Sequence, residues 1–502
     1  MMHGVPQSET QEEPDRYPPL LRFHRFPLEM PYSERRLLLL VGDTLTLFGC
    51  AFLAQYWQRL LEPHMRHSDY QIWWLAILGV AWLLGAAINE CYTLQRSQRR
   101  FNALRQVCVA TIEAGLIYLV VFFLIGRPAI LPVPSATTYP LFLKLNPPPR
   151  LLPVFFLLAT LLLMTGWRLA YLDLLHSRLW RRRVLIVGAG RAGCALVEAI
   201  QRTRHDYEIV GFIDDDPAKQ ATRLQGVPVL GTHHELLQLV QTYQVSEVVL
   251  AITNDIDMGV WRVLMHCYEQ GVCIHAMALV YEEALERIPI EHLGKKWFPD
   301  PLNRGLPTFY RACKRVVDIT LALVGVVLLG ALLIPVAPAI YLESRGPIFY
   351  EQERLGRGGK RFRLLKLRTM EPQAEQGGQV VWATAGDARV TRVGRLLRPT
   401  RLDELPQVLM VLKGDMSIVG PRPERPEFVR HLEEQIPFYR TRLSVKPGLT
   451  GWAQINYHYG SSIEDAATKL QYDLYYIKHR SMLLDLLIML RTIHVMLALG
   501  GI

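Results

Sequence analysis

The sequence predicts a membrane α-helical bundle, followed by an α/β Rossmann-like domain and an α+β membrane-associated domain with a re-entrant helix. Three observations predict this order. Apolar stretches long enough to cross a membrane fill the first third of the 502 residues. Short β-branched runs that alternate with helical stretches follow. The last part is basic, aromatic and rich in turns, and an apolar stretch lies near its start.

The N-terminal region is expected to form a disordered cytoplasmic tail over residues 1–34 and a four-helix transmembrane domain over residues 35–176. The tail is polar and proline-rich, and it shows no apolar segment of a cleaved signal peptide. Four apolar stretches of about 20 residues follow, which is the length that a helix needs to cross the hydrocarbon layer. They lie near 37–60, 71–90, 104–126 and 151–172.

Basic residues beside these stretches predict their orientation. Arginines precede the first stretch, separate the second from the third and follow the fourth, whereas the other two loops carry few. The positive-inside rule then places the N-terminus and everything after Arg183 in the cytoplasm. Glu113 falls within the third stretch, where an isolated carboxylate is costly. It could contact a lipid head group, but a protonated or paired side chain that faces the bundle is the favoured interpretation.

The net charge and the cysteine content limit the kinds of partner and metal site that the chain could have. The formal net charge of +10 could face nucleic acid, anionic lipid or phosphate-bearing substrates, and the positions of the basic residues must decide between them. The seven cysteines form no CxxC pair and show no metal-ligand spacing with histidine. They are therefore expected to be reduced thiols, and neither a disulfide framework nor a zinc site is predicted.

Residues 184–290 are predicted to form the Rossmann-like accessory domain. Five short runs read as parallel strands joined by helices: 184–190, 208–216, 227–230, 247–252 and 272–277. Gly188, Gly190 and Gly193 follow the first strand, and Asp214 ends the second, which is the spacing of a dinucleotide-binding fingerprint. These four residues are the possible nucleotide-binding residues of this domain.

A redox use of that fingerprint is not favoured. The YxxxK pair formed by Tyr310 and Lys314 lies beyond the last strand and next to an apolar stretch, so it is interpreted as a coincidence. The ligand of this domain is unknown.

The third domain, 308–502, starts with the apolar stretch 316–342, which contains Pro335. Basic residues lie on both sides of this stretch. They favour a helix that enters the membrane from the cytoplasm, breaks near Ile334 and Pro335, and returns to the same side. The alternative is a fifth span that would place everything downstream outside. At the C-terminus, 481–499 is apolar but carries charged residues, so an interfacial helix is expected there.

The candidate site lies in the segment 400–424. Leu405, Val408 and Leu412 repeat at helical spacing, so Asp403 and Glu404 should lie at the start of a helix. Neighbouring carboxylates in such a place could hold Mg²⁺ beside a phosphate or attack the phosphate directly. Ordinary helix capping is the alternative explanation.

Cations around the pair favour a phosphate site. Arginine recurs at every third position before the pair, and the full basic set is Arg389, Arg392, Arg395, Arg398, Arg401, Lys366, Arg368 and Arg422. This many cations near two carboxylates fit a diphosphate whose charge must be neutralised during phosphoryl transfer. A basic face held to anionic lipid could also use some of the arginines. Lys366, Arg368, Arg398, Arg401 and Arg422 are the predicted phosphate-binding residues.

Three segments of this domain resemble the bacterial sugar transferases, the polyprenyl-phosphate hexose-1-phosphate transferases. They are GPIFYEQERLGRGGKRFRLLKLRTM (346–370), RVTRVGRLLRPTRLDELPQVLMVLKGDMSIVGPRPERPEF (389–428) and VKPGLTGWAQIN (445–456). The upstream order of spans and a Rossmann-like domain resembles the long, polytopic members of this family. In those proteins the Rossmann-like domain is accessory, which implies a regulatory or oligomerising role for 184–290.

The resemblance implies a phosphoglycosyl transferase that moves hexose-1-phosphate from a UDP-hexose to undecaprenyl phosphate and releases UMP. Asp403 would be the nucleophile that forms a phosphosugar-aspartyl intermediate, and Glu404 would help it hold Mg²⁺. Arg398 and Arg422 would contact phosphate. Family members often carry Ser-Pro at the helix break, where this sequence has Ile334 and Pro335, so a hydroxyl hydrogen bond is lost there.

The resemblance further implies a multi-pass protein of the bacterial inner membrane whose catalytic domain lies at the cytoplasmic face. Membrane lipid is an expected partner, nucleic acid is not, and a homo-oligomer stays open. Two alternatives to the transferase are a membrane-tethered NAD-dependent nucleotide-sugar dehydratase and a non-enzymatic scaffold for polysaccharide assembly. Trp452, Tyr457 and Tyr459 could stack a uracil, but an interfacial anchor is favoured.

Overall fold

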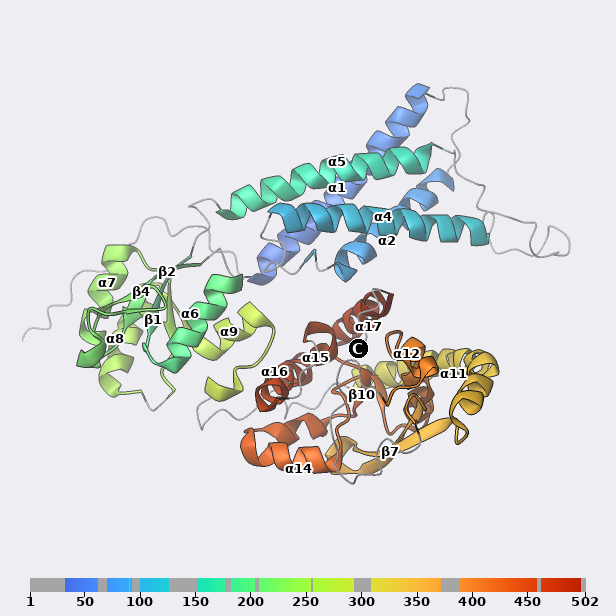
Figure 1. Cartoon of the computed structure of the whole chain (residues 1–502). Coiled ribbons are helices and arrows are strands. Elements are labelled where there is room, and N and C mark those ends of the chain that lie inside the picture. The colour runs from blue at the N-terminus through green and yellow to red at the C-terminus, as the bar shows by residue number, and fades with distance from the viewer. Residues whose placement is uncertain are drawn as a thin grey trace, which may run out of the picture.

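The computed structural model describes eleven segments of the chain, and the fold is stated for these alone. They are residues 32–61, 70–89, 91–92, 100–125, 151–176, 182–203, 207–253, 256–292, 308–371, 389–457 and 462–497. The predicted tail before residue 32 and the side chains of Tyr459 and His494 lie outside the described residues. Figure 1 shows a helical region, an α/β domain and a mixed domain in chain order.

The helical region contains α1 (Tyr32–Leu61), α2 (Tyr70–Ile88), α4 (Arg100–Ile125) and α5 (Leu152–His176). Three of these helices, over 37–61, 100–123 and 152–174, are long and apolar enough to cross a membrane. The second predicted span is shorter, because its apolar part covers only Ile72–Ile88. The 19 residues of α2 still reach about 28 Å at 1.5 Å per residue.

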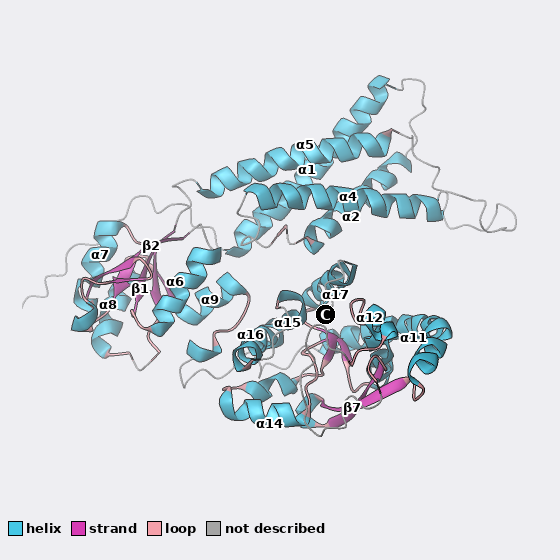
Figure 2. Ribbon diagram, viewed as in Figure 1, coloured by secondary structure: helices cyan, strands magenta, loops and turns pink. Residues whose placement is uncertain are grey.

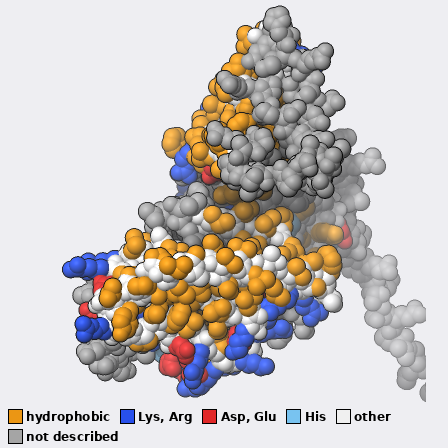
Figure 3. Space-filling model, turned by 90° about the vertical axis from the view of Figure 1, so that its right-hand side faces the viewer, with side chains coloured by type: hydrophobic (Ala, Val, Ile, Leu, Met, Phe, Trp, Pro, Cys, Tyr) orange, Lys and Arg blue, Asp and Glu red, His pale blue; other side chains and the backbone are white. Residues whose placement is uncertain are grey.

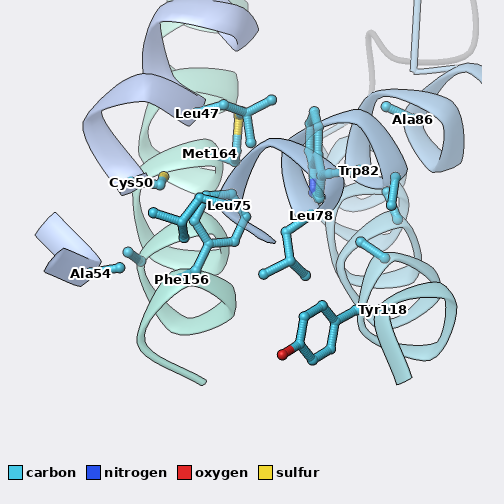
Figure 4. Close-up of a cluster of buried hydrophobic side chains, with 14 of the residues drawn as sticks. Leu47, Cys50, Ala54, Leu75, Leu78, Trp82, Ala86, Tyr118, Phe156 and Met164 are labelled. Carbon is cyan, nitrogen blue, oxygen red and sulfur yellow. The ribbon is translucent and has the colours of Figure 1, made fainter. Parts of the chain in front are cut away.

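Large side chains fill the interior of this helical region. Leu47 of α1, Trp82 of α2 and Phe156 and Met164 of α5 are among its buried core residues (Figure 4). Glu113 of α4 accepts a hydrogen bond of 2.7 Å from the Asn89 side chain, so the prediction that it is paired is confirmed.

The α/β domain is built on a six-stranded sheet in the order β3-β4-β2-β1-β5-β6. Its strands are β1 (Arg182–Val187), β2 (Tyr207–Ile213), β3 (Arg223–Leu224), β4 (Val227–Gly231), β5 (Glu247–Leu250) and β6 (Cys273–Ala276). All neighbouring pairs are parallel except β3 and β4, so the predicted parallel sheet is confirmed. The two-residue strand β3 was not predicted.

Helices cover both faces of this sheet (Figure 2). One face packs against α6 (Arg191–Thr203) and α9 (Met277–Leu285), and the other against α7 (Leu236–Tyr243) and α8 (Met258–Glu269). The central strands β1 and β5 are mostly buried by apolar side chains, as expected for a parallel sheet, whereas the edge strands β3 and β6 are partly exposed.

The third domain begins with α11 (Thr308–Ser344), a single helix of 37 residues. The helix was predicted to break near Ile334 and Pro335. This prediction is wrong, because the helix continues through Pro335 and Pro338. A proline removes one backbone hydrogen bond, and a helix can absorb this loss by bending. Figure 1 shows α11 changing direction before the chain enters β7.

The rest of this domain consists of short elements around the candidate site. An antiparallel hairpin is formed by β7 (Phe349–Leu355) and β8 (Arg361–Leu367), and a parallel pair by β9 (Ser417–Val419) and β10 (Gly448–Thr450). The helices are α12 (Arg392–Leu397), α13 (Val408–Lys413), α14 (Pro426–Gln435), α15 (Trp452–Asn456), α16 (Ile463–His479) and α17 (Met482–Leu497), with 3-10 turns η6 (Leu402–Gln407) and η7 (Tyr439–Ser444).

The third domain carries a broad exposed apolar surface (Figure 3). Val327, Ile334 and Leu342 of α11 are more than 70% exposed, as are Leu396 of α12 and Leu483 of α17. Exposed apolar area of this extent marks a surface that contacts lipid or another protein.

The charged residues of α17 point inward, away from this surface. Asp485 is buried and accepts hydrogen bonds from Tyr310 (2.9 Å) and Lys314 (2.9 Å) at the start of α11 and from Tyr476 (2.8 Å). Arg491 is also buried. The pair Tyr310 and Lys314 therefore has a structural role that ties α11 to α17, far from the glycine loop of the α/β domain.

Candidate functional site

The candidate site is centred on the first turn of η6, which carries Asp403 and Glu404. Both side chains are buried, with 7% and 8% of their residue surface exposed. Arg401 begins this turn in the left-handed region, with φ of 55°. The carboxylates thus lie at the start of a helical segment, but its first six residues form a 3-10 helix and the α-helix begins only at Val408.

Glu404 is held by two cations from distant parts of the chain. Its Oε1 accepts hydrogen bonds from Lys366 Nζ (2.8 Å) on β8 and from Arg422 Nη2 (2.7 Å) in the turn after β9. Burial alone would raise its pKa, but these two cations outweigh burial and hold the pKa of Glu404 far below its usual range. Glu404 is therefore a permanent anion that fixes Lys366 and Arg422 in place.

Asp403 differs from its neighbour in having no hydrogen-bond partner for its side chain among the described residues. Burial raises the pKa of its carboxyl to about 6, and the charge of Glu404 adds to this rise. Lys366, Arg398 and Arg422 act in the opposite direction but do not cancel it. The site thus contains one carboxylate that is paired with two cations and one carboxylate, without a described hydrogen-bond partner, whose pKa is raised to about 6.

The remaining predicted phosphate-binding residues take different positions. Arg398 follows α12, and its Nε donates to the Thr369 hydroxyl (3.0 Å). Arg368 is buried next to the end of α11, where its Nη2 donates to the Ser344 hydroxyl (2.8 Å). Arg398 is one of the cations whose charge lowers the pKa of Asp403.

The arginines that recur at every third position do not lie on one helix. Only Arg392 and Arg395 belong to α12, which ends at Leu397, and Arg389 lies in a turn before it. Pro399 and the left-handed Arg401 prevent the helix from continuing past Leu397 toward the carboxylates. The chain reversal brings Arg398 toward the site and leaves Arg392 and Arg395 exposed.

Sequence reasoning missed Arg442 and misjudged Trp452. Arg442 is buried, and its Nη2 donates to the backbone carbonyl of Arg422 (3.1 Å). Trp452 was expected to be an interfacial anchor, but it is 2% exposed and its Nε1 donates to the carbonyl of Glu286 (3.1 Å). It is a core residue between α16 and α17, so neither predicted role applies. Neither position carries a local sequence signal.

Hydrogen bonds and close contacts among its own residues hold the glycine loop of the α/β domain in shape. Asp214 Oδ2 accepts from the backbone N–H of Ala189 (2.7 Å) and is 3.1 Å from Lys219 Nζ. Gly188 has φ of +110°, and a Cβ on Gly193 would lie 2.2 Å from the Gly188 carbonyl. These two glycines are required by the fold. Gly190 has open space around it.

Comparisons with known proteins agree with a membrane transferase that acts on phosphate groups. The family model described as bacterial sugar transferase matches residues 309–499. A second family model, described as a CoA-binding domain, matches residues 148–278.

Curated relatives extend the match. The UDP-N-acetylgalactosamine-undecaprenyl-phosphate N-acetylgalactosaminephosphotransferase of Aeromonas hydrophila is 37% identical over 297 residues, 58% of this chain and 67% of that protein. A UDP-glucose:undecaprenyl-phosphate glucose-1-phosphate transferase of Xanthomonas campestris pv. campestris is 33% identical and covers 54% of this chain and 57% of its own length. One with the same name from Caulobacter vibrioides is 46% identical over 36% of this chain and 68% of its own length.

The fold and the site define a membrane-associated transferase of phosphorus-containing groups. More specifically, the chain belongs to the bacterial sugar transferase family.

Proposed function

We propose that this protein is a phosphoglycosyl transferase that moves a hexose-1-phosphate from a UDP-sugar to undecaprenyl phosphate and releases UMP. The observation that carries the proposal is the difference in hydrogen bonding between two adjacent buried carboxylates. Glu404 is neutralised by Lys366 and Arg422, whereas Asp403 has no described hydrogen-bond partner. A free carboxylate beside fixed cations is suited to attack a phosphate whose charge those cations offset.

The reaction would proceed in two displacements at one phosphorus. A carboxylate oxygen of Asp403 attacks the sugar-bearing phosphorus, and the bond from this phosphorus to the bridging oxygen breaks, so UMP leaves with the electron pair. An oxygen of the lipid phosphate then attacks the same phosphorus and displaces the Asp403 carboxylate. The product is a sugar linked to the lipid through a diphosphate, and the enzyme returns to its starting state.

Mg²⁺ fits this site as a cofactor that is shared with the substrate. Asp403 and the second carboxylate oxygen of Glu404 would hold the ion, because Lys366 and Arg422 both bond mainly to Oε1. Mg²⁺ commonly uses one or two carboxylates together with substrate phosphates. When bound, it would supply positive charge to the diphosphate. No cluster of three or more acidic, histidine or cysteine ligands occurs within the described ranges, which agrees with a shared ion.

The membrane arrangement is part of the proposal. Basic residues flank α11 on both sides, and its prolines allow the helix to bend, which supports a re-entrant helix with both ends in the cytoplasm. The site would then lie at the cytoplasmic face of the inner membrane, at the depth of lipid phosphates. This transfer would be the first membrane step in making an exopolysaccharide, a capsule or an O-antigen.

The test is release of UMP by membranes or purified protein supplied with undecaprenyl phosphate and a panel of UDP-sugars. The names of the relatives include both glucose and N-acetylgalactosamine, so both donors belong in the panel. We expect UMP release with at least one donor, loss of release in excess EDTA and recovery with Mg²⁺. Full activity in EDTA would refute the metal, and no release with any donor would refute the function.

A further inference from the structure

Arg368 is a buried arginine with unsatisfied hydrogen-bond donors. The residue is 6% exposed. Its Nη2 donates to the Ser344 hydroxyl (2.8 Å) and more weakly to the Ser344 carbonyl (3.4 Å). Its Nε and Nη1 are buried and have no hydrogen-bond partner, and no carboxylate of the described segments forms an ion pair with it. A buried cation with free donors is costly unless an anion completes its bonds.

The backbone around Arg368 is shaped to leave room for its guanidinium. A Cβ on Gly346 would lie 2.3 Å from Nη1. The Arg368 N–H also bonds to the Ile348 carbonyl (2.9 Å), which fixes the end of β8 against the segment that leaves α11. The guanidinium is therefore held at one place, between the end of the apolar helix and the hairpin.

This place is connected to Asp403 and Glu404 through the residues on either side of Arg368. Lys366, two residues earlier and on the same side of an extended chain, bonds to Glu404. Thr369, the next residue, accepts a hydrogen bond from Arg398, whose charge acts on Asp403. Leu367 packs in the same cluster as Leu402, the residue before Asp403. Arg368 is thus placed to hold an anion that approaches the site from the end of α11.

The surroundings fit an anion that carries an apolar tail. Tyr341 and Leu342 near the end of α11 are 58% and 78% exposed, and Leu396 of α12 is 73% exposed. The two helices are joined by Glu343, whose carboxylate accepts from the backbone N–H groups of Arg392 (2.6 Å) and Val393 (3.0 Å). Figure 3 shows the hydrophobic face of this domain, with lysine and arginine side chains at its edges.

We propose that Arg368 binds the phosphate of the lipid acceptor, a long-chain isoprenyl monophosphate, while its tail lies along the exposed apolar residues of α11 and α12. This inference rests on the proposed transferase function. The cations would then have different roles. Lys366 and Arg422 bind Glu404 beside the diphosphate of the UDP-sugar. Arg368 has two nitrogen atoms, Nε and Nη1, left to donate hydrogen bonds to a second phosphate.

The experiment separates the two half-reactions in the purified full-length protein. Covalent labelling by radioactive UDP-sugar without acceptor measures the first half, and the KM for undecaprenyl phosphate measures the second. For Arg368→Gln we expect labelling within threefold of wild type and an acceptor KM raised by about 10- to 100-fold, the size of a lost charge-assisted contact. Arg363→Gln on the same strand is the control, since that side chain is 82% exposed.

A second variant keeps the test informative if Arg368→Gln does not fold. Gly346→Ala retains the charge but places a methyl group against Nη1, so it should raise the acceptor KM in the same direction. A labelling rate that falls with the KM unchanged would assign Arg368 to the donor and overturn the inference. An unchanged KM with weaker binding to anionic vesicles would assign it to bulk lipid and also overturn it. Absence of UMP release with every donor in wild type would instead refute the transferase function itself.

Inorganic phosphate distinguishes the lipid from a free anion. If the lipid phosphate is the ligand, millimolar inorganic phosphate should compete weakly in wild type, because it lacks the apolar tail. Strong competition that disappears in Arg368→Gln would identify a site for free phosphate and contradict the lipid assignment.

Discussion

At the scale of single residues, the site depends on opposite environments for two neighbouring carboxylates. Glu404 receives hydrogen bonds from two cations, and Asp403 receives none from the described residues. The sequence predicts the pair and the abundance of cations nearby. It does not predict which cation serves which carboxylate, because Lys366 and Glu404 are 38 positions apart and meet only when β8 packs beside η6.

The raised pKa of Asp403 predicts an acid limit on the first half-reaction. The carboxylate must be ionised to attack phosphorus, so the rate of covalent labelling should fall about tenfold per pH unit below about 6 and level off above it. Labelling without acceptor is the suitable measurement, because a phosphate monoester itself titrates near pH 6. A labelling rate that is constant between pH 5 and 7 would contradict this expectation.

Asp473 is the necessary control for that profile. It is buried beside Arg442, and burial also raises the pKa of its carboxyl to about 6. In Asp473→Asn an acid limit should persist if it belongs to Asp403, at the same or a higher pH, because Asp473 also orients Arg442. Its disappearance in this variant would assign the limit to Asp473.

Asp403→Asn should abolish labelling and UMP release while making the folded protein more stable. The pKa of Asp403 is raised on folding, so its ionisation costs stability at pH values above its ordinary pKa, and the cost is complete above about 6. Asparagine has a similar shape and no charge. We expect a gain of roughly 1 to 3 kcal/mol at pH 7.5 that vanishes near pH 4.

Thermal unfolding of wild type and Asp403→Asn at the two pH values measures this difference. Activity within tenfold of wild type would remove Asp403 from the mechanism. A melting temperature lowered at pH 7.5 would show that the carboxylate has structural partners that its geometry does not reveal.

At the scale of elements, the position of Arg422 depends on a turn that is fixed from outside. Arg442 of η7 donates to the Arg422 carbonyl, and Arg354 of β7 donates to the Pro423 carbonyl (3.2 Å). Arg442 is itself oriented by Asp473 of α16, whose Oδ2 lies 2.9 Å from its Nη2. The Gly-Pro-Arg-Pro turn is visible in the sequence, but the residues that orient it come from separate elements and could not be predicted.

Arg442→Lys should reduce UMP release by about 10- to 100-fold without abolishing folding. A lysine cannot contact the Arg422 carbonyl, Asp473 and the Tyr439 hydroxyl in one plane as arginine does. Arg422 should then bind Glu404 less well and lower the pKa of Asp403 less. The acid limit of the labelling profile should therefore move to higher pH, which a purely structural defect would not cause.

Arg440→Lys is the matched control for this variant. It lies two residues earlier in the same turn, is 66% exposed and pairs with Glu433 at 3.0 Å. We expect it to keep wild-type activity. An unchanged pH profile in Arg442→Lys would contradict a positioning role for Arg442.

Glycines allow close backbone contacts in other segments of the same region. A Cβ on Gly448 would lie 2.1 Å from the Gly420 nitrogen, and one on Gly451 would lie 2.2 Å from the Gly420 carbonyl. The turns on either side of β9 and β10 therefore cross with backbone in direct contact. The sequence shows these glycines as motifs, and only the packing of the two strands gives their physical reason.

At the scale of the whole molecule, the α/β domain is joined to the third domain through α16. Glu282 of α9 is buried and accepts hydrogen bonds from Lys478 Nζ (2.6 Å) and from His479 Nε2 at the end of α16. The Ile288 N–H bonds to the Gln471 carbonyl of the same helix (3.1 Å). The sequence predicts two separate domains with a loop between them, and it gives no sign that the segment after α9 packs into the core of the next domain.

Glu282→Gln should loosen this junction and leave the chemistry largely intact. Burial opposes ionisation of Glu282, but His479 and Lys478 outweigh it and lower the pKa of its carboxyl, so at neutral pH the variant loses a partly buried charged contact. We expect the free energy of local opening to fall by roughly 1 to 3 kcal/mol, which is about a 5- to 150-fold faster hydrogen exchange at the Ile288 amide.

Glu283→Gln, at the exposed neighbouring position, is the control and should exchange as wild type does. UMP release should change by less than tenfold, because the contact between Asp473 and Arg442 lies earlier on α16 and is retained. Unchanged exchange at Ile288 would show that apolar packing alone holds the two domains together, whereas a large loss of activity would show that the position of the α/β domain controls the site.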